Sequence, residues 1–189
     1  MPYPAQITRD SILEKAREMV EAEGADQLSL HKLAAALGVK APSLYRYFAG
    51  KSDLLRALNL QTARQMTAAM KAAADIPGDA HARLLAMAKA CRDFGHTYPM
   101  TYRLAFTNTH PELRPDDELL EAIALPIQRV MAQISGEAHS LAALRGAWAL
   151  INGFIMLELS GQFRRGGDLE AAFVQSVEAY LAGWSQIAN

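Results

Sequence analysis

The chain has 189 residues, of which 51% are hydrophobic, and its formal net charge is −1. This length suffices for one or two small domains with a real core, and the near-neutral balance excludes binding of polyanions through bulk charge alone. The single cysteine, Cys91, excludes an intrachain disulfide and favours a reducing compartment. Neither a signal peptide nor an apolar run of transmembrane length is predicted, so the sequence indicates a cytoplasmic protein without a membrane partner.

Helices are expected along the whole chain. No run of alternating β-branched residues lasts five positions, which predicts an all-α fold of about nine helices. The first helix is expected to follow the N-cap residue Thr8 and to end at Gly24. Its apolar side is formed by Ile12, Leu13, Ala16, Met19 and Val20.

The stretch 28–54 is typical of two short helices joined by a tight turn and followed by a third helix. The first short helix is expected after the N-cap residue Ser29 and before Gly38, where the backbone needs a left-handed residue. Its apolar stripe is formed by Leu30, Leu33, Ala34 and Leu37. The second short helix is expected to span 42–48, with a proline near its start. A polar, basic second helix after a glycine turn is typical of a helix-turn-helix that enters a DNA major groove.

Positive charge is concentrated in the same stretch. Between Ser29 and Arg56, five basic residues and one acid, Asp53, give a local net charge of +4, which leaves −5 for the rest of the chain. A basic patch on a near-neutral protein favours specific DNA binding with modest non-specific affinity. The alternative interpretation is a generic surface hairpin of two helices with a buried aromatic pair.

This stretch resembles the DNA-binding domain of the TetR family of bacterial transcriptional regulators. The residues that match the family pattern without an insertion are Leu33, Ala34, Leu37–Val39, Ser43–Phe48, Lys51, Leu54 and Leu55. The resemblance implies a three-helix DNA-binding domain at 1–50 and an effector-binding and dimerisation domain at 51–189. Lys40 departs from the pattern, since a small polar cap usually stands there. A lysine caps poorly but is long enough to reach a base edge or a phosphate.

The resemblance also implies how DNA is contacted. The residues expected to contact phosphates are Ser29, Tyr45, Tyr47 and Lys51. The residues expected to face base edges are Lys40, Ala41, Ser43 and Arg46. Arginine is suited to a bidentate contact with guanine, and the alanine methyl group is suited to a thymine methyl.

Six further helices are expected, at residues 51–74, 79–98, 100–107, 117–134, 139–163 and 169–187. Pro126 is expected to kink or restart the fourth of these. The helix at 139–163 is apolar on more than one face, whereas a surface helix keeps a polar face. Two buried faces indicate an intrachain core and a partner, so a homodimer through the last two helices is expected. The alternative is a central helix in a monomeric bundle.

Residues 98–106 and 148–163 resemble the effector domain of one TetR subgroup, whose pattern holds a Trp, a His-Gly pair and then LELAGxF. Asn152-Gly153 stands here in place of the His-Gly pair. The resemblance implies a site for a small effector, and large, flexible or aromatic lining residues favour a largely apolar one. The candidate lining residues are Phe94, Tyr98, Tyr102, Met131, Trp148, Asn152 and Met156.

Neither catalysis nor a metal is indicated. No histidine pairs with His, Cys or an acid at the spacing of metal ligands, so no metal or other cofactor is expected. No nucleophile or phosphate-loop motif is present, so the residues that an enzyme would need are missing. Cys91 lies on an apolar face and is expected to be buried. The expected function is a ligand-responsive repressor that its effector releases from a near-palindromic operator on double-stranded DNA. The alternatives are an activator or a constitutive regulator without a ligand.

Overall fold

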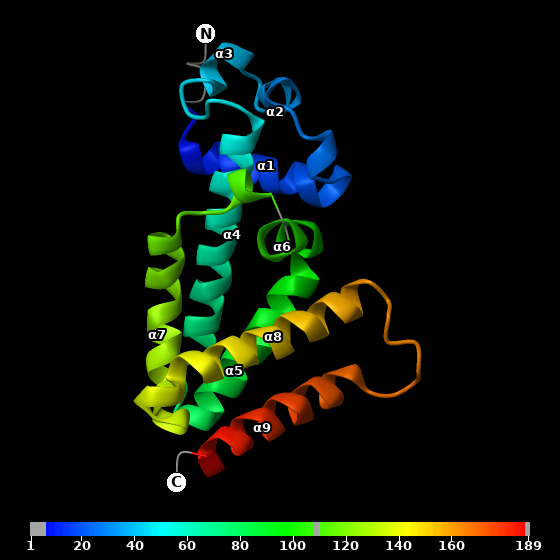
Figure 1. Cartoon of the computed structure of the whole chain (residues 1–189). Coiled ribbons are helices and arrows are strands. Elements are labelled where there is room, and N and C mark those ends of the chain that lie inside the picture. Colours follow the sequence, from blue (N-terminus) through cyan, green and yellow to red (C-terminus); the bar gives the residue numbers. More distant parts are fainter. Residues whose placement is uncertain (1–6, 108–109, 188–189) are drawn as a thin grey trace. The chain divides into compact units, whose positions relative to one another are not determined.

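The fold is all-α, as the sequence predicts. The computed structural model describes residues 7–107 and 110–187, and within them it contains nine α-helices, three short 3-10 helices and no strand (Figure 1). The helix count agrees with the expected number, and the disagreements concern where individual helices end.

The chain forms two compact units. Unit 1 comprises Met1–Thr62 and Tyr98–Pro115, and unit 2 comprises Ala63–Thr97 and Asp116–Asn189. Helix α4 (Lys51–Ala73) begins in unit 1 and ends in unit 2, as one uninterrupted helix. The domain boundary expected after residue 50 is a different division of the chain and stays a prediction.

Unit 1 contains α1 (Arg9–Glu23), η1 (Ala25–Gln27), α2 (Leu30–Ala36), α3 (Ala41–Leu44), the start of α4, α6 (Pro99–Phe106) and η2 (Pro111–Leu113). Helix α1 begins as predicted, because the hydroxyl groups and backbone N–H groups of Thr8 and Ser11 bond reciprocally in a capping box. Apolar side chains of the first four α-helices meet in one core. Its fully buried members include Ile12, Ala16, Val20, Leu33, Leu44, Leu54 and Leu58.

The turn between α2 and α3 has the predicted geometry. The Ser29 hydroxyl oxygen accepts from the Lys32 N–H at 3.2 Å and caps α2, and Gly38 has φ = +69°, the left-handed conformation. The second helix is shorter than predicted, since α3 ends at Leu44 and not at Phe48. The N–H groups of Tyr47 and Phe48 both donate to the Leu44 carbonyl oxygen. The chain therefore closes into a tight turn, and the Phe48 ring is buried.

Unit 2 contains the end of α4, α5 (Ala80–Thr97), α7 (Asp117–Ser135), η3 (Glu137–His139), α8 (Ser140–Leu159) and α9 (Leu169–Ile187). Helix α7 continues through Pro126, so the restart expected there does not occur. Helix α8 ends at Leu159, before the expected end at Phe163. The cause is Gly161, which has φ = +65° and donates its N–H to the Glu158 carbonyl. Helices α8 and α9 lie side by side (Figure 1).

Helix α8 is apolar but sparsely covered by its own chain. With η3 it forms the 23-residue stretch Glu137–Leu159, which is long enough for a membrane span and holds an 18-residue window with a mean hydropathy of 1.4, contrary to the expectation that no run is long enough. This is weak evidence for a membrane, since core helices of soluble proteins share these properties. Its most apolar window is 28% buried, and Leu141 and Leu157 are 45% and 43% exposed. The uncovered side of α8 is therefore suited to a partner.

Candidate functional site

The residues that the sequence assigned to DNA bases lie on an accessible stretch of unit 1. Lys40 and Arg46 are exposed, while Ala41 and Ser43 are half-buried. Lys40 is the N-cap residue of α3, and its side chain makes no cap, since an ammonium group has no acceptor for the first N–H groups of a helix. Two cations and two small side chains at the surface are the residue types that read base edges in a major groove.

The four residues expected at phosphates differ in what their polar atoms already bind. Tyr45 is 50% exposed. The Lys51 ammonium donates to a carbonyl of η1 at 2.9 Å, which leaves two further N–H donors, and Ser29 accepts as a cap and keeps its hydroxyl proton. The Tyr47 hydroxyl differs, because it donates its one proton to the Ile7 carbonyl oxygen at 2.8 Å.

One acid lies within this basic region, and its charge is engaged locally. Asp53 accepts from the Ala49 N–H at 3.0 Å and from the Arg56 guanidinium at 3.1 Å. The bond from Ala49 is the main reason why the pKa of Asp53 lies below its usual range, against a smaller opposite effect of burial; pairing with Arg56 and the charge of Arg9 add to the lowering. Asp53 thus stays ionised and offsets Arg56, and Lys32 pairs with Glu23 at 3.7 Å, which leaves Lys40, Arg46 and Lys51 for an anionic partner.

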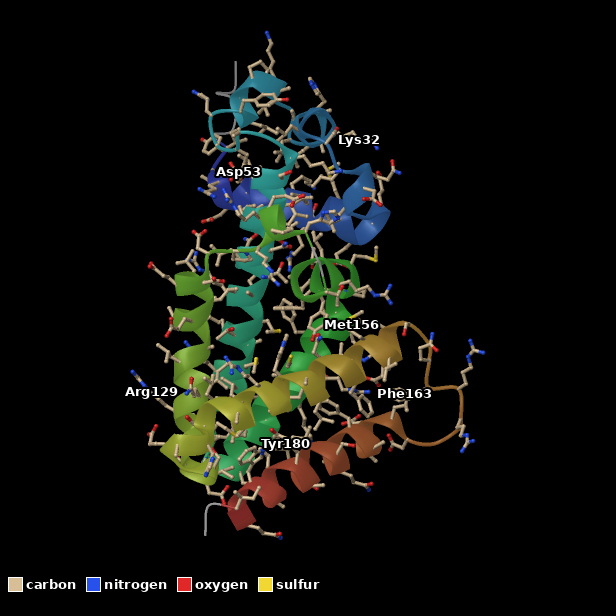
Figure 2. The ribbon with its side chains drawn as sticks, in the orientation of Figure 1. Lys32, Asp53, Arg129, Met156, Phe163 and Tyr180 are labelled. Carbon is tan, nitrogen blue, oxygen red and sulfur yellow. The ribbon has the colours of Figure 1, made fainter. Side chains whose placement is uncertain are left out.

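Five of the seven candidate effector residues belong to unit 2. They are Phe94, Met131, Trp148, Asn152 and Met156. Phe94 and Met131 are buried, on α5 and α7. The other three are half-buried and recur every four residues along α8, so they share one side of that helix (Met156 is marked in Figure 2). Their role in effector binding stays a prediction.

The two remaining candidates, Tyr98 and Tyr102, belong to unit 1. Tyr98 is the N-cap residue of α6, and its ring centroid lies 4.2 Å from the Arg17 guanidinium. Tyr102 is fully buried, with its ring centroid 4.9 Å from that of Phe106. Both tyrosines therefore have packing contacts within unit 1, and their role in effector binding stays a prediction.

Sequence reasoning misses a buried ion pair in unit 2. The Glu158 side chain on α8 is 4% exposed, and its two oxygens accept from the Arg92 guanidinium at 2.7 and 2.8 Å. His96, on α5 like Arg92, lies 3.1 Å from the same carboxylate. Burial acts to raise the pKa of Glu158, but the hydrogen bonds from Arg92 and His96 hold it below its usual range. The one available signal is an acid near the end of a largely apolar helix.

Sequence reasoning also misses the residue that fixes α6 within unit 1. The Glu21 carboxylate on α1 accepts from the N–H groups of Met100 and Thr101 at 3.0 and 2.9 Å, and from the Thr101 hydroxyl at 2.6 Å. The first N–H groups of a helix have no partner within it, so Glu21 caps α6 from outside. The amide of Asn59 on α4 donates to the Leu113 carbonyl at 2.8 Å and fastens the segment that follows α6.

No metal centre accompanies these contacts in the described part of the chain, where no three His, Cys, Asp or Glu side chains are placed to hold an ion. Cys91 is buried, as expected, with its Sγ 3.6 Å from the Sδ of Met66 on α4. Burial shields this thiol from solvent, which disfavours a role as a redox sensor.

Two family models match the chain. The model described as "Bacterial regulatory proteins, tetR family" matches residues 12–58, and the model described as "Tetracyclin repressor-like, C-terminal domain" matches residues 84–180. The uncharacterized HTH-type transcriptional regulator Rv0681 of Mycobacterium tuberculosis is 33% identical over 188 residues, 95% of this chain and 83% of that protein. The HTH-type transcriptional repressor DrrR1 of Streptomyces coeruleorubidus is 44% identical over 54 residues, 29% of this chain and 20% of that protein.

Solved structures share the fold. A protein of unknown function from Rhodococcus sp. RHA1 superposes with a TM-score of 0.81 at 24% identity, over 97% of this chain and 98% of that one. A TetR variant from Acinetobacter baumannii AYE in complex with minocycline superposes with a TM-score of 0.74 at 23% identity, over 97% of this chain and 99% of that one. At such identities the likeness shows the fold alone, and it confirms an all-α chain with a helix-turn-helix.

Proposed function

Since the chain belongs to the TetR family of bacterial transcriptional regulators, which are DNA-binding proteins and not enzymes, we propose that it is a ligand-responsive repressor. It binds its operator until a small, largely apolar effector shifts it to a state with lower operator affinity. The observation that carries this proposal is the recognition segment, residues 40–48, which exposes Lys40 and Arg46 above a fully buried core. A regulator of this kind acts on DNA in the cytoplasm.

The contacts follow from the chemistry of each side chain. Arg46 is assigned a bidentate contact with guanine, and Ala41 a contact with a thymine methyl. The full set of proposed contacts is Lys40, Ala41, Ser43 and Arg46 at base edges, and Ser29, Tyr45 and Lys51 at phosphates. Tyr47 is left out of the residues proposed to contact phosphates, because its one hydroxyl proton is already donated to the Ile7 carbonyl oxygen.

Dimerisation through α8 and α9 explains why α8 is apolar but sparsely covered. Leu157 on α8 and Ile187 at the end of α9 are 43% and 62% exposed, and a second copy would bury such side chains. A two-fold dimer presents two recognition segments related by symmetry. It therefore requires a near-palindromic operator with half-sites about 34 Å apart, one DNA turn.

The proposed effector contacts lie on α8 and the helices beside it in unit 2. Trp148, Asn152 and Met156 share one side of α8, and they combine an aromatic, an amide and a flexible thioether side chain. Such a lining suits an apolar molecule oriented by one or two polar contacts. That a structural neighbour, the TetR variant from Acinetobacter baumannii, was solved with minocycline supports a ligand-responsive chain of this fold.

Selection of bound duplexes from a random pool tests the DNA-binding half of the proposal. On the selected operator, Arg46→Ala is expected to cost about 1–3 kcal/mol and to relax preference at one base position. Lys51→Ala is expected to weaken all sequences alike and to lower the salt slope by about one unit. Equal, sequence-independent losses for both variants would contradict the base contact assigned to Arg46.

A metabolite panel applied to the operator complex tests the ligand half. A compound that releases DNA must bind the free protein more tightly than it binds the operator complex. The ratio of these two affinities equals the factor by which the compound lowers operator affinity. Asn152→Trp is expected to block that compound while operator binding persists. If every bound compound had the same affinity for free and DNA-bound protein, the alternative of an activator or constitutive regulator without a ligand would be favoured.

A further inference from the structure

The start of α1 is fastened to the end of the recognition segment. The Tyr47 hydroxyl donates to the Ile7 carbonyl oxygen at 2.8 Å, across 40 positions of the sequence. At the next position, the Phe48 ring lies 5.1 Å from the guanidinium carbon of Arg9. Two consecutive aromatic residues therefore hold residues 7–9 in place, and Arg9 is fixed beside the segment that is proposed to meet DNA.

Arg9 is held by a ring face rather than by a carboxylate. Phe48 is 1% exposed and belongs to the core of unit 1, so it is a rigid platform, whereas Arg9 itself is exposed. Stacking on an aromatic face orients a guanidinium but leaves its in-plane N–H donors free. Within residues 7–107 and 110–187, Arg9 forms no ion pair.

The nearby acid does not consume the charge of Arg9. The charge of Arg9 has the smallest effect on the pKa of Asp53 among the groups that act on it. The oxygens of Asp53 already accept from the Ala49 N–H and the Arg56 guanidinium. Asp53 and the start of α1 lie in the same part of unit 1 (Figure 2). Arg9 is thus an oriented, uncompensated cation next to the recognition segment.

We propose that Arg9 is an additional phosphate-contacting residue of the DNA interface, and that Tyr47 is the positioning residue that holds it there. The inference rests on the DNA binding of the proposed function and extends it to a residue outside the helix-turn-helix. A phenolic hydroxyl has one proton, so Tyr47 cannot donate to a phosphate while it donates to Ile7. Tyr47 acts through Arg9, in place of the direct phosphate contact that the sequence predicts.

Salt dependence of DNA binding by the full-length protein tests the assignment of Arg9. Fluorescence anisotropy on a random-sequence duplex of about 30 base pairs gives the slope of log K against log salt concentration, whose magnitude falls by about 0.9 for each phosphate that the protein no longer neutralises. Arg9→Gln is expected to lower this slope by about one unit per protomer bound, and Arg9→Lys to restore it. Arg129→Gln, an exposed arginine on α7 in unit 2, removes the same charge and is expected to leave the slope unchanged.

A double-mutant cycle separates the two roles of Tyr47. If Tyr47 only positions Arg9, Tyr47→Phe weakens binding in the wild-type background and has no further effect in the Arg9→Gln background. If Tyr47 donates to its own phosphate, the two effects add and the positioning role is overturned. An unchanged slope in Arg9→Gln overturns the phosphate contact of Arg9 itself. Wild-type protein that binds no duplex would instead refute the proposed function, a result distinct from both.

Discussion

The carboxylate of Glu158 offers the sharpest test of how unit 2 is held together. Glu158→Gln keeps the shape of the side chain but removes its charge, and it leaves the Arg92 guanidinium, 16% exposed, without its anion. Removing one partner of a buried pair costs about 3–5 kcal/mol, and the access of Arg92 to water lowers the expected loss to about 2–3 kcal/mol. His96 is 42% exposed, so His96→Ala is expected to cost less than about 1 kcal/mol.

Urea denaturation followed by circular dichroism measures these losses in the free energy of unfolding. Protein concentration must be held fixed, because the apparent stability of a dimer depends on it. Glu178→Gln, at an exposed position on α9, removes the same charge and serves as the matched control. If Glu158→Gln lost no more stability than Glu178→Gln, the ion pair would contribute nothing and the reasoning from burial would be refuted.

Acid provides a second readout of the same carboxylate. The pKa of Glu158 in the folded protein lies below its ordinary value of 4.5, so its contribution to stability is fully present above about pH 4.5 and is lost as pH falls through the folded pKa. The stability difference between wild type and Glu158→Gln is therefore expected to shrink in that acidic range. A difference that stayed constant from about pH 7 to about pH 3 would show that ionisation of Glu158 is not linked to folding, and it would contradict the lowered pKa.

Three other changes test the cap of α6, the packing of Tyr180 and the proposed dimer interface. Glu21→Ala removes the cap of α6 and is expected to cost about 1–3 kcal/mol and to speed hydrogen exchange of the first amides of α6. Gly146→Ala places a Cβ 2.2 Å from the Tyr180 Oη, so the ring must move and its hydroxyl loses the 2.8 Å hydrogen bond to the Ala143 carbonyl. A loss of about 1–3 kcal/mol in the free energy of unfolding is expected in thermal unfolding, and Tyr180→Phe is expected to restore part of it. Leu157→Asp is expected to yield monomers in sedimentation velocity, while an unchanged dimer would move the interface away from α8.

Local signals in the sequence predict the helix-turn-helix well. Ser29, Gly38 and Thr8 each act through atoms within a few residues, so residue type alone indicates a cap or a left-handed turn. The wrongly predicted helix ends also differ from the observed ends by only a few residues. Apolar periodicity continued past Leu44 and past Leu159, and it cannot reveal the turn that closes the backbone there.

Contacts between distant segments could not be predicted in the same way. Glu21 meets the start of α6 across about 80 positions, and Glu158 meets Arg92 across 66. A charged residue on a helix surface looks the same in sequence whether it is solvated or paired, since the partner is set by tertiary packing. For that reason the sequence assigned Tyr98 to an effector site without indicating that it also begins a helix of unit 1 and stacks on Arg17.

The ion pair also bears on how α8 presents its apolar side. Apolar packing alone specifies the rotation of such a helix weakly, because several of its faces are apolar enough to be buried. A carboxylate with its partners on α5 is far more selective: the charge of Glu158 is compensated only when this residue faces Arg92 and His96. Successive residues of a helix are about 100° apart, so that constraint turns the neighbouring Leu157 outward, where it is 43% exposed. We therefore expect Glu158→Gln to weaken self-association as well as stability, and a dimer dissociation constant unchanged from wild type would show that packing alone sets the rotation.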